Sequence, residues 1–325
     1  MDQADYARLS PDLVLDAVES LGFLSDARIL ALNSYENRVY QIGIEDEEPL
    51  IAKFYRPGRW SDAQIQEEHT FTFELIEQEI PVIAPIIKNG KSLFEYESYR
   101  FSLYPRRGGH APELDNLDTL YTLGQHLGRI HGIGATRTFD ARPEINIQNF
   151  AIESRNYIIS QNIVPRSLEE AYNTLTQHLI DKVQSLYDES QYKKIRLHGD
   201  CHPGNILVRY DNLHIVDLDD ARNGPAIQDI WMLLNGDRAQ KVSQLSAIMD
   251  GYEEFCDFDY KEFKLIEVFR TLRMLHYCGW LAKRWEDPAF PLAFPWFNTE
   301  NYWASHILEL REQLSTLDEA PLALQ

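Results

Sequence analysis

The segments HGDCHPGN (198–205) and IVD (215–217) decide the fold of this 325-residue chain. They place Asp200, Asn205 and Asp217 close together in the sequence. An ionised carboxylate only accepts hydrogen bonds, so Asp200 is able to take a proton from a hydroxyl group. Mg²⁺ prefers hard oxygen ligands, often one or two side chains together with phosphate groups, which suits Asn205 and Asp217. The pattern therefore predicts a proton acceptor beside a magnesium site.

The residues between Asn205 and Asp217 predict a β-hairpin. Residues 206–208 form a short apolar run, the Asp-Asn pair at 211–212 is a turn signal, and residues 213–216 indicate a returning strand. Such a hairpin brings its two polar ends together at the open side. A short motif of this kind also occurs in ordinary surface hairpins, so the other parts of a catalytic site must be present.

A lysine inside an apolar strand supplies the next part. The segment LIAKF (50–54) predicts a strand interrupted by Lys53, and a buried lysine costs free energy unless it is paired. Kinases use a lysine in such a strand to contact the phosphates of ATP and to pair with a glutamate on a helix. The alternative is a lysine on an edge strand, where its charge prevents aggregation.

A predicted helix at residues 61–77 offers two glutamates, Glu67 and Glu68, as partners for Lys53. Glu68 lies two helical turns before Leu75, and therefore on the same face. We favour Glu68 as the partner and expect Glu67 to be solvated.

The segment ALNSYENRVY (31–40) joins two strand-like runs, at the position where a kinase places its phosphate-covering loop. The G-x-G-x-x-G pattern of protein kinases is missing from it. Asn33, Ser34 and Asn37 are able to donate hydrogen bonds to phosphate oxygens instead. The alternative is an ordinary polar hairpin turn.

The segment RRGG (106–109) predicts a linker of the kind that a kinase uses as a hinge. Backbone groups of Leu103, Tyr104 and Pro105 would then face adenine, although Pro105 offers only a carbonyl. We therefore place Tyr104 among the nucleotide contacts.

These parts, in this order, resemble the aminoglycoside phosphotransferase and choline kinase superfamily, which shares the protein-kinase-like fold. Within it, several segments look closely similar to those of a group of bacterial serine/threonine kinases of the stress response. These segments are LNSYENRVYQ (32–41), KFYRP (53–57), LHGDCHPGNIL (197–207), VDLDDARNGPAIQDIWMLLNGD (216–237) and DPAFPLAFPWF (287–297).

The resemblance implies an α+β, two-lobed fold, with a small β-rich lobe at 1–104 and a larger, mainly helical lobe at 105–325. It implies ATP and Mg²⁺ as cofactors. Asp200 would accept the hydroxyl proton, and Ser34 would contact ATP. The metal ligands would be Asn205 and Asp217, the latter also counted as catalytic.

The catalytic loop departs from the protein-kinase pattern at one position. His198 would take the structural place of the histidine in that loop, whereas Gly199 replaces the arginine that commonly reads a phosphorylated activation loop. Downstream, Asp219 and Asp220 either face the acceptor or extend the metal shell. We expect Asp229 to be structural and to bind loop backbone near the catalytic loop.

Composition limits the class of partner. A net charge of −20 argues against nucleic acid and anionic membranes. The charge suits a cationic acceptor, such as a basic peptide or an aminocyclitol, but acidity also serves solubility alone. No run approaches the ~20 apolar residues of a membrane span, and the N-terminus lacks the apolar region of a signal peptide. We expect a cytoplasmic monomer.

Several helices are predicted after the linker, and a cluster of aromatic residues spans 280–303. The aromatic cluster forms either an acceptor-site wall or an apolar core. Helical spacing of apolar residues predicts helices at 117–131, 167–187, 226–235, 241–255, 261–285 and 300–315.

The sequence predicts an ATP- and Mg²⁺-dependent phosphotransferase. Our first hypothesis is a serine/threonine protein kinase that acts on a protein substrate, with the kinase itself as one candidate substrate. The second is an O-phosphotransferase for an amino alcohol or aminoglycoside, because the wider superfamily uses the same motifs and fold alone does not separate the two. The third is a non-catalytic nucleotide-binding scaffold, against which the complete set of Lys53, Asp200, Asn205 and Asp217 argues.

Overall fold

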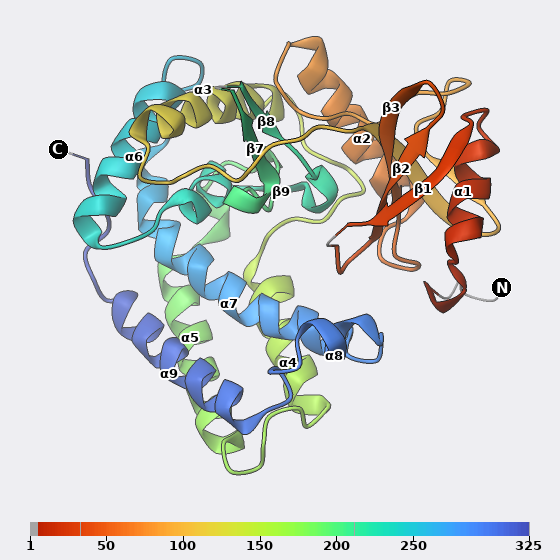
Figure 1. Ribbon diagram of the computed structural model, residues 1–325. Helices are drawn as coiled ribbons and strands as arrows, with labels where there is room; N and C mark the ends of the chain where they lie inside the picture. The colour runs from red at the N-terminus through yellow and green to blue at the C-terminus, as the bar shows by residue number, and fades with distance from the viewer. Residues whose placement is uncertain (1–5, 33, 211, 325) are drawn as a thin grey trace. The chain divides into compact units, whose positions relative to one another are not determined.

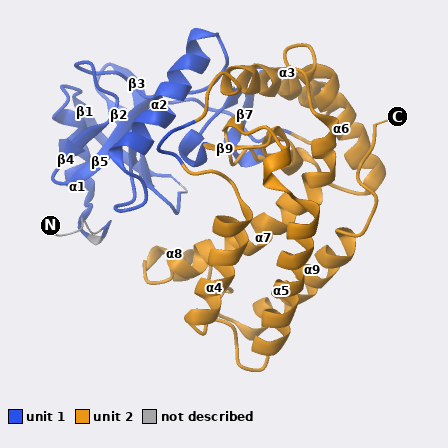
Figure 2. Cartoon of the chain, turned by 180° about the vertical axis from the view of Figure 1, so that it is seen from behind, with its two compact units in different colours: residues 1–112, 139–142, 203–221 blue, residues 113–138, 143–202, 222–325 orange. Residues whose placement is uncertain are grey.

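The computed structural model describes residues 6–32, 34–210 and 212–324 (Figure 1). The chain forms two compact units, coloured separately in Figure 2. The first unit comprises residues 1–112, 139–142 and 203–221, and the second comprises 113–138, 143–202 and 222–325. Two later segments thus return to the first unit. A functional boundary between residues 104 and 105 remains a prediction.

The first unit is built on a five-stranded antiparallel sheet with the strand order β1-β2-β3-β5-β4. The strand predicted at 50–54 is confirmed as the second half of a strand that spans Glu47–Phe54. The strands are β1 (Ser25–Ala31), β2 (Arg38–Ile44), β3 (Glu47–Phe54), β4 (Phe94–Tyr96) and β5 (Tyr99–Pro105).

Side chains alternate between the two faces of this sheet. One face, with Ala52 and Phe54 of β3, is buried in a core against helix α1 (Pro11–Glu19). Lys53 therefore points to the opposite face, where β5 pairs it with Ser102. The alternation explains how a charged residue fits into an apolar strand.

Helix α2 (Asp62–Glu77) begins with a capping box between Ser61 and Gln64. The hairpin of β7 (Ile206–Arg209) and β8 (Asn212–Ile215) also belongs to the first unit. The predicted hairpin is confirmed, and Asp211 of its expected turn lies outside the described residues.

The second unit is mainly helical, with one small antiparallel pair formed by β6 (Ile195–Leu197) and β9 (Arg222–Gly224). Helices α3 and α6 cross closely because both carry glycine at the contact: a Cβ on Gly124 would lie 2.0 Å from the carbonyl oxygen of Ile248. The helices are α3 (Leu117–Gly134), α4 (Glu153–Ser160), α5 (Glu169–Leu186), α6 (Arg238–Tyr252), α7 (Ile266–Lys283), α8 (Ala289–Ala293) and α9 (Glu300–Thr316).

Short helical turns complete both units. The predicted helix at 226–235 is wrong: the segment forms two 3-10 turns, and the side chains of Gln228 and Asp229 bind the backbone of Gly199, a tertiary contact that helical spacing does not reveal. The 3-10 helices are Tyr6–Arg8, Glu189–Gln191, Pro203–Asn205, Leu218–Asp220, Ala226–Asp229, Trp231–Leu233 and Tyr260–Leu265, and Gln148–Ile152 is a π-helical turn.

Across the described ranges, no helix combines the length and the apolar character needed to cross a membrane.

Candidate active site

The open end of the β7–β8 hairpin brings Asn205 and Asp217 together. Ile206 pairs with Ile215 in the ladder. Immediately beyond this pair, the N–H of Val216 donates to the carbonyl of Asn205 at 2.9 Å, and Asp217 follows. The predicted proximity is confirmed, and two residues with oxygen-bearing side chains lie at one end of the hairpin.

Asp217 has a left-handed backbone, with φ 62° and ψ 65°. This conformation costs roughly 1–2 kcal/mol for most residues other than glycine, although aspartate tolerates it better than others. The side chain is 52% exposed, and its Oδ1 lies 2.9 Å from Nζ of Lys53. A strained residue with an exposed carboxylate is typical of functional sites.

Lys53 is buried and doubly paired. Its Nζ lies 2.9 Å from Asp217 and 3.0 Å from Oδ1 of Asp219. Burial alone disfavours the ammonium ion, but the carboxylates of Asp217 and Asp219 outweigh it, so the pKa of Lys53 lies well above its usual value. Lys53 is therefore a fixed positive charge at neutral pH.

Asp219 faces inward, so the hypothesis that it faces an acceptor is wrong. Its carboxylate contacts Lys53 on one side and the guanidinium of Arg59 on the other. Although burial opposes ionisation, Lys53 and Arg59 lower the pKa of Asp219. Arg59 also binds Asp220 at 2.7 Å. The two acids thus act as counter-ions for buried cations.

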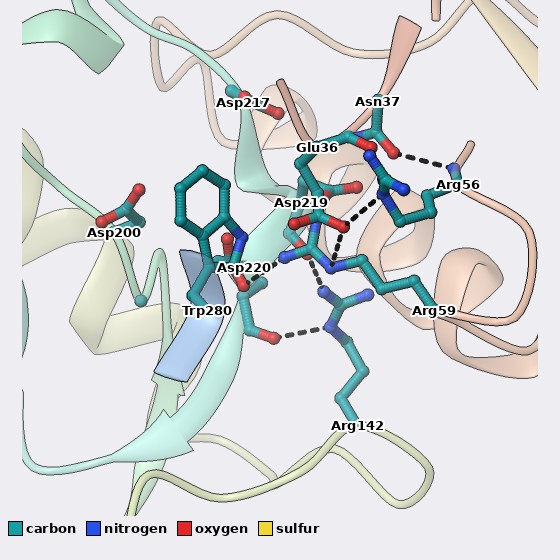
Figure 3. A network of polar contacts seen from close by, with 12 residues as sticks. Glu36, Asn37, Arg56, Arg59, Arg142, Asp200, Asp217, Asp219, Asp220 and Trp280 are labelled. Carbon is teal, nitrogen blue, oxygen red and sulfur yellow. Dashed lines mark hydrogen bonds and ion pairs between the residues drawn. The ribbon is translucent and has the colours of Figure 1, made fainter. Parts of the chain in front are cut away.

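Arg142 binds the backbone of the same segment (Figure 3). Its guanidinium donates to the carbonyls of Asp219 and Ala221, and to that of Gln64 at 2.9 Å. It also lies over the ring of Trp60, 4.5 Å from the centroid. The turn that follows Asp217 is therefore held by both its side chains and its carbonyls.

The two glutamates of α2 have roles that differ from the prediction. Glu67 is not solvated: its carboxylate accepts hydrogen bonds from the backbone N–H groups of residues 140–142 at 2.8–3.0 Å. Glu68 is buried, and among the described residues it makes no ion pair with Lys53, whose ammonium group contacts Asp217 and Asp219 instead. Burial outweighs the attraction of Lys53 and raises the pKa of Glu68 to about 7.

Tyr104 lies on the same sheet face as Lys53, and its hydroxyl is 3.2 Å from that of Tyr55. The carbonyl of Leu103, which we expected to face adenine, accepts a hydrogen bond from the N–H of Ile86 at 2.7 Å. A contact between Tyr104 and a nucleotide remains a proposal. It would be made by the backbone or the ring of Tyr104.

The loop between β1 and β2 contains the predicted phosphate contacts. Ser34 is half-buried. Asn37 is buried, and its Oδ1 accepts a hydrogen bond from the N–H of Arg56 at 3.1 Å, which fixes the loop to the end of β3. Asn33 lies outside the described residues.

Asp200 belongs to the second unit, where its carboxylate is paired. Oδ1 accepts a hydrogen bond from Nη1 of Arg273 on α7, and Oδ2 lies 3.6 Å from Nε2 of His202. The side chain of Asp200 is 20% exposed. The predicted proton acceptor therefore lies against an arginine that the sequence pattern did not reveal.

The backbone before Asp200 is held by Asp229. The carboxylate of Asp229 accepts hydrogen bonds from the N–H of His198 at 2.7 Å and of Gly199 at 2.8 Å. One of its oxygens also lies 3.2 Å from Nε2 of His131. The predicted structural role of Asp229 is confirmed. Gly199 has φ +84°, which explains why glycine occupies this position.

The aromatic residues at 280–303 differ in burial. Phe290, Phe297 and Trp303 are buried in the core, whereas Trp296 is exposed and Trp280 is half-buried on α7. The core hypothesis holds for the first three, and Trp280 packs against Phe290 with ring centroids 5.0 Å apart.

The comparisons with known proteins identify the family. The family model described as the phosphotransferase enzyme family matches residues 28–266. The chain belongs to this phosphotransferase family. It is 45% identical to stress response kinase A of Escherichia coli O157:H7 over 319 residues, covering 98% of this chain and 97% of that protein. It is 44% identical, with the same coverage, to the serine/threonine protein kinase RdoA of Salmonella typhimurium.

Solved structures of phosphotransferases share the fold. The amicoumacin kinase hAmiN, in complex with AMP-PNP, Ca²⁺ and Ami, has a TM-score of 0.76 and 20% identity, covering 98% of this chain and 96% of that one. The microcompartment-associated aminopropanol kinase has a TM-score of 0.70 and 15% identity, covering 95% and 99%. The predicted fold and superfamily are confirmed.

Three cations that contact the candidate residues or their backbone were not predicted, namely Arg59, Arg142 and Arg273. They lie in two loops and one helix without a recognisable motif. The one available signal was the density of acids in the segment 217–220, because three carboxylates in four residues require counter-charges when they are buried. The acid-rich segment indicates that cationic partners are needed, but it does not show where in the sequence those partners lie.

The residues at the hairpin end fit a magnesium ion. Asn205 and Asp217 supply oxygen atoms, and Mg²⁺ commonly keeps several waters and binds one or two protein side chains together with phosphate groups. Within the part of the chain that the structure describes, no three His, Cys, Asp or Glu residues are grouped to hold a metal by themselves. A site that phosphates complete is consistent with both facts.

Proposed function

We propose that this chain is a serine/threonine protein kinase that transfers the γ-phosphoryl group of ATP, with Mg²⁺, to a hydroxyl group of a protein. The observation that carries the proposal is the ion pair between buried Lys53 and the exposed carboxylate of Asp217, which follows Asn205 at the hairpin end, with Nζ and Oδ1 2.9 Å apart. The full-length similarity to stress response kinase A and to RdoA supports the choice of a protein acceptor.

Each residue has a defined task in the proposed reaction. Lys53, fixed in its charged form, binds phosphate oxygens. Asn205 and Asp217 hold the metal, which when bound neutralises charge on the phosphates. Ser34, Glu68 and Tyr104 complete the proposed nucleotide contacts, with Glu68 acting on Lys53 through its field because the two groups are not in contact.

The transfer step uses Asp200. The acceptor oxygen forms a bond to the γ-phosphorus, and the bond between that phosphorus and the β,γ-bridging oxygen breaks. ADP leaves with the bonding electrons, and the hydroxyl proton passes to the carboxylate of Asp200. The guanidinium of Arg273 contacts this carboxylate.

Labelled ATP tests the proposal. The protein is incubated with [γ-³²P]ATP and Mg²⁺, alone and with a generic protein substrate, and mass spectrometry locates the phosphate. Phosphate on serine or threonine is expected. The solved structures that share the fold are named as kinases of small molecules, so a panel of amino alcohols and aminoglycosides is assayed in parallel. Efficient labelling of that panel with none of any protein would replace the protein-kinase proposal.

A further inference from the structure

The candidate proton acceptor lies in contact with an arginine. The guanidinium of Arg273 contacts Oδ1 of Asp200, and the ring of His202 lies near Oδ2. The side chain of Arg273 is 34% exposed, so it is accessible to an acceptor that approaches Asp200. An acceptor hydroxyl that reaches this carboxylate must therefore bind next to a permanent positive charge.

The same face of α7 continues with aromatic residues. Tyr277 and Trp280 follow Arg273 at helical spacing, and their rings are stacked with centroids 5.7 Å apart and planes 19° apart. Arg284, one turn further, lies over the ring of Trp280 at 5.4 Å. Arginine, tyrosine and tryptophan are the residues most enriched at the centres of protein recognition surfaces.

We propose that Arg273 determines the charge of the acceptor: it selects serine or threonine in an acidic polypeptide segment and rejects cationic acceptors. The inference rests on the proposed kinase function and names its substrate class. Arg273 repels a cationic group on an acceptor that approaches Asp200. It attracts an acidic side chain next to the acceptor hydroxyl. Such a side chain also competes with Asp200 for the guanidinium, which releases Oδ1 to receive the proton.

This local charge opposes that of the whole chain. The net charge of −20 attracts basic partners over long distances. That field is screened within about 10 Å in ordinary salt, whereas Arg273 acts on an acceptor in direct contact. We therefore expect the charge of Arg273, and not the net charge of the chain, to determine which acceptor is preferred at Asp200.

Two pairs of peptides test the inference. Within a pair, the peptides differ only in the residues flanking the central position, which are glutamate in one and lysine in the other. One pair carries alanine at the centre, and its dissociation constants are measured by fluorescence anisotropy at physiological salt. The other pair carries serine, and kcat/KM is measured. We expect the wild type to favour the acidic peptide about tenfold or more in both measurements.

The variants separate the charge of Arg273 from its packing. For Arg273→Gln, the acidic and basic peptides are expected to have nearly equal dissociation constants and nearly equal kcat/KM. Arg273→Lys is expected to keep most of the preference for the acidic peptide. Lys283→Gln removes the same charge from an exposed position in the last turn of α7, and is expected to retain the wild-type ratios. Circular dichroism confirms that each variant is folded.

The outcomes distinguish this inference from the proposed function. A wild-type preference for the basic peptide, equal or unmeasurable binding of both alanine peptides, or a preference unaffected by Arg273→Gln overturns the role of Arg273. If binding follows Arg273 but no serine peptide is phosphorylated, the selectivity stands and the protein-kinase function fails.

Discussion

The two compact units, each taken by itself, hold their candidate carboxylates by different means. In the first unit, Asp217 and Asp219 bind a lysine that is only 7% exposed, and Arg59 closes the network from the other side. In the second unit, Asp200 is partly exposed and contacts Arg273, while the backbone before it is bound by the carboxylate of Asp229. The first arrangement fixes charge in advance, and the second leaves a base that an acceptor is able to reach.

This difference matches the two tasks of a phosphotransferase. Binding a polyphosphate requires preorganised charge that does not rearrange during the reaction. Accepting different polypeptides requires an accessible base with an adaptable neighbour. Mutations are therefore expected to separate into those that remove turnover in the second unit and those that remove stability or metal binding in the first.

The largest effect is expected from Asp200→Ala. Removal of a general base typically costs ~10²–10⁴-fold in rate, and Asp200 is not among the proposed nucleotide contacts. Phosphoryl transfer should fall by this factor while the dissociation constant of ATP, measured by calorimetry, stays within about twofold of wild type. Wild-type turnover in this variant would remove Asp200 from the mechanism, and a parallel loss of ATP binding would break the comparison between the two units.

Arg59→Met tests whether the first unit depends on its buried charges. Removing one partner from a buried ionic network typically costs about 3–5 kcal/mol, because the remaining charge is uncompensated. Urea denaturation should show a loss of unfolding free energy of that order. Arg28→Met, which removes the exposed ion pair with Asp26, is the matched control and should leave the unfolding free energy nearly unchanged. Equal stabilities of both variants would show that the network contributes little.

Asp217→Asn sharpens the assignment of the metal. It replaces a charged oxygen ligand with a neutral one, and it also weakens the pair with Lys53. Binding of Mg²⁺·ATP should weaken by about tenfold or more, whereas binding of ATP in the presence of EDTA should change less. A dependence on Mg²⁺ identical to that of the wild type would exclude Asp217 as a ligand.

The structural features that the sequence predicted correctly rest on short patterns of neighbouring residues. The β7–β8 hairpin, the strand around Lys53 and the structural role of Asp229 follow from patterns that span a few residues each. Glu67 was misjudged because the loop at 139–142 that it binds is some seventy residues away in the chain. The helix predicted at 226–235 was wrong for a related reason, since the side chains of Gln228 and Asp229 bind the backbone of Gly199, which is distant in the chain.

The smallest effect concerns the pH dependence of stability in the first unit, and it depends on Glu68. The pKa of Glu68 is raised from 4.5 to about 7, chiefly by burial, with Lys53 opposing the shift. The folded state therefore binds a proton more tightly than the unfolded state. The stabilisation is complete below about pH 4.5 and is lost as the pH rises to about 7.

Glu68→Gln, which mimics the protonated form of the side chain, should remove this dependence of the unfolding free energy on pH. Chemical denaturation between pH 4.5 and 7.5 is expected to show a decline for the wild type that is absent in the variant, with a difference of the order of 1–3 kcal/mol. Glu77→Gln makes the same chemical change at an exposed position at the end of α2 and should keep the wild-type slope. If Glu68→Gln also keeps that slope, Glu68 is ionised throughout. It would then act as a third carboxylate for Lys53, and the first unit would hold more fixed negative charge than the contacts of Asp217 and Asp219 supply.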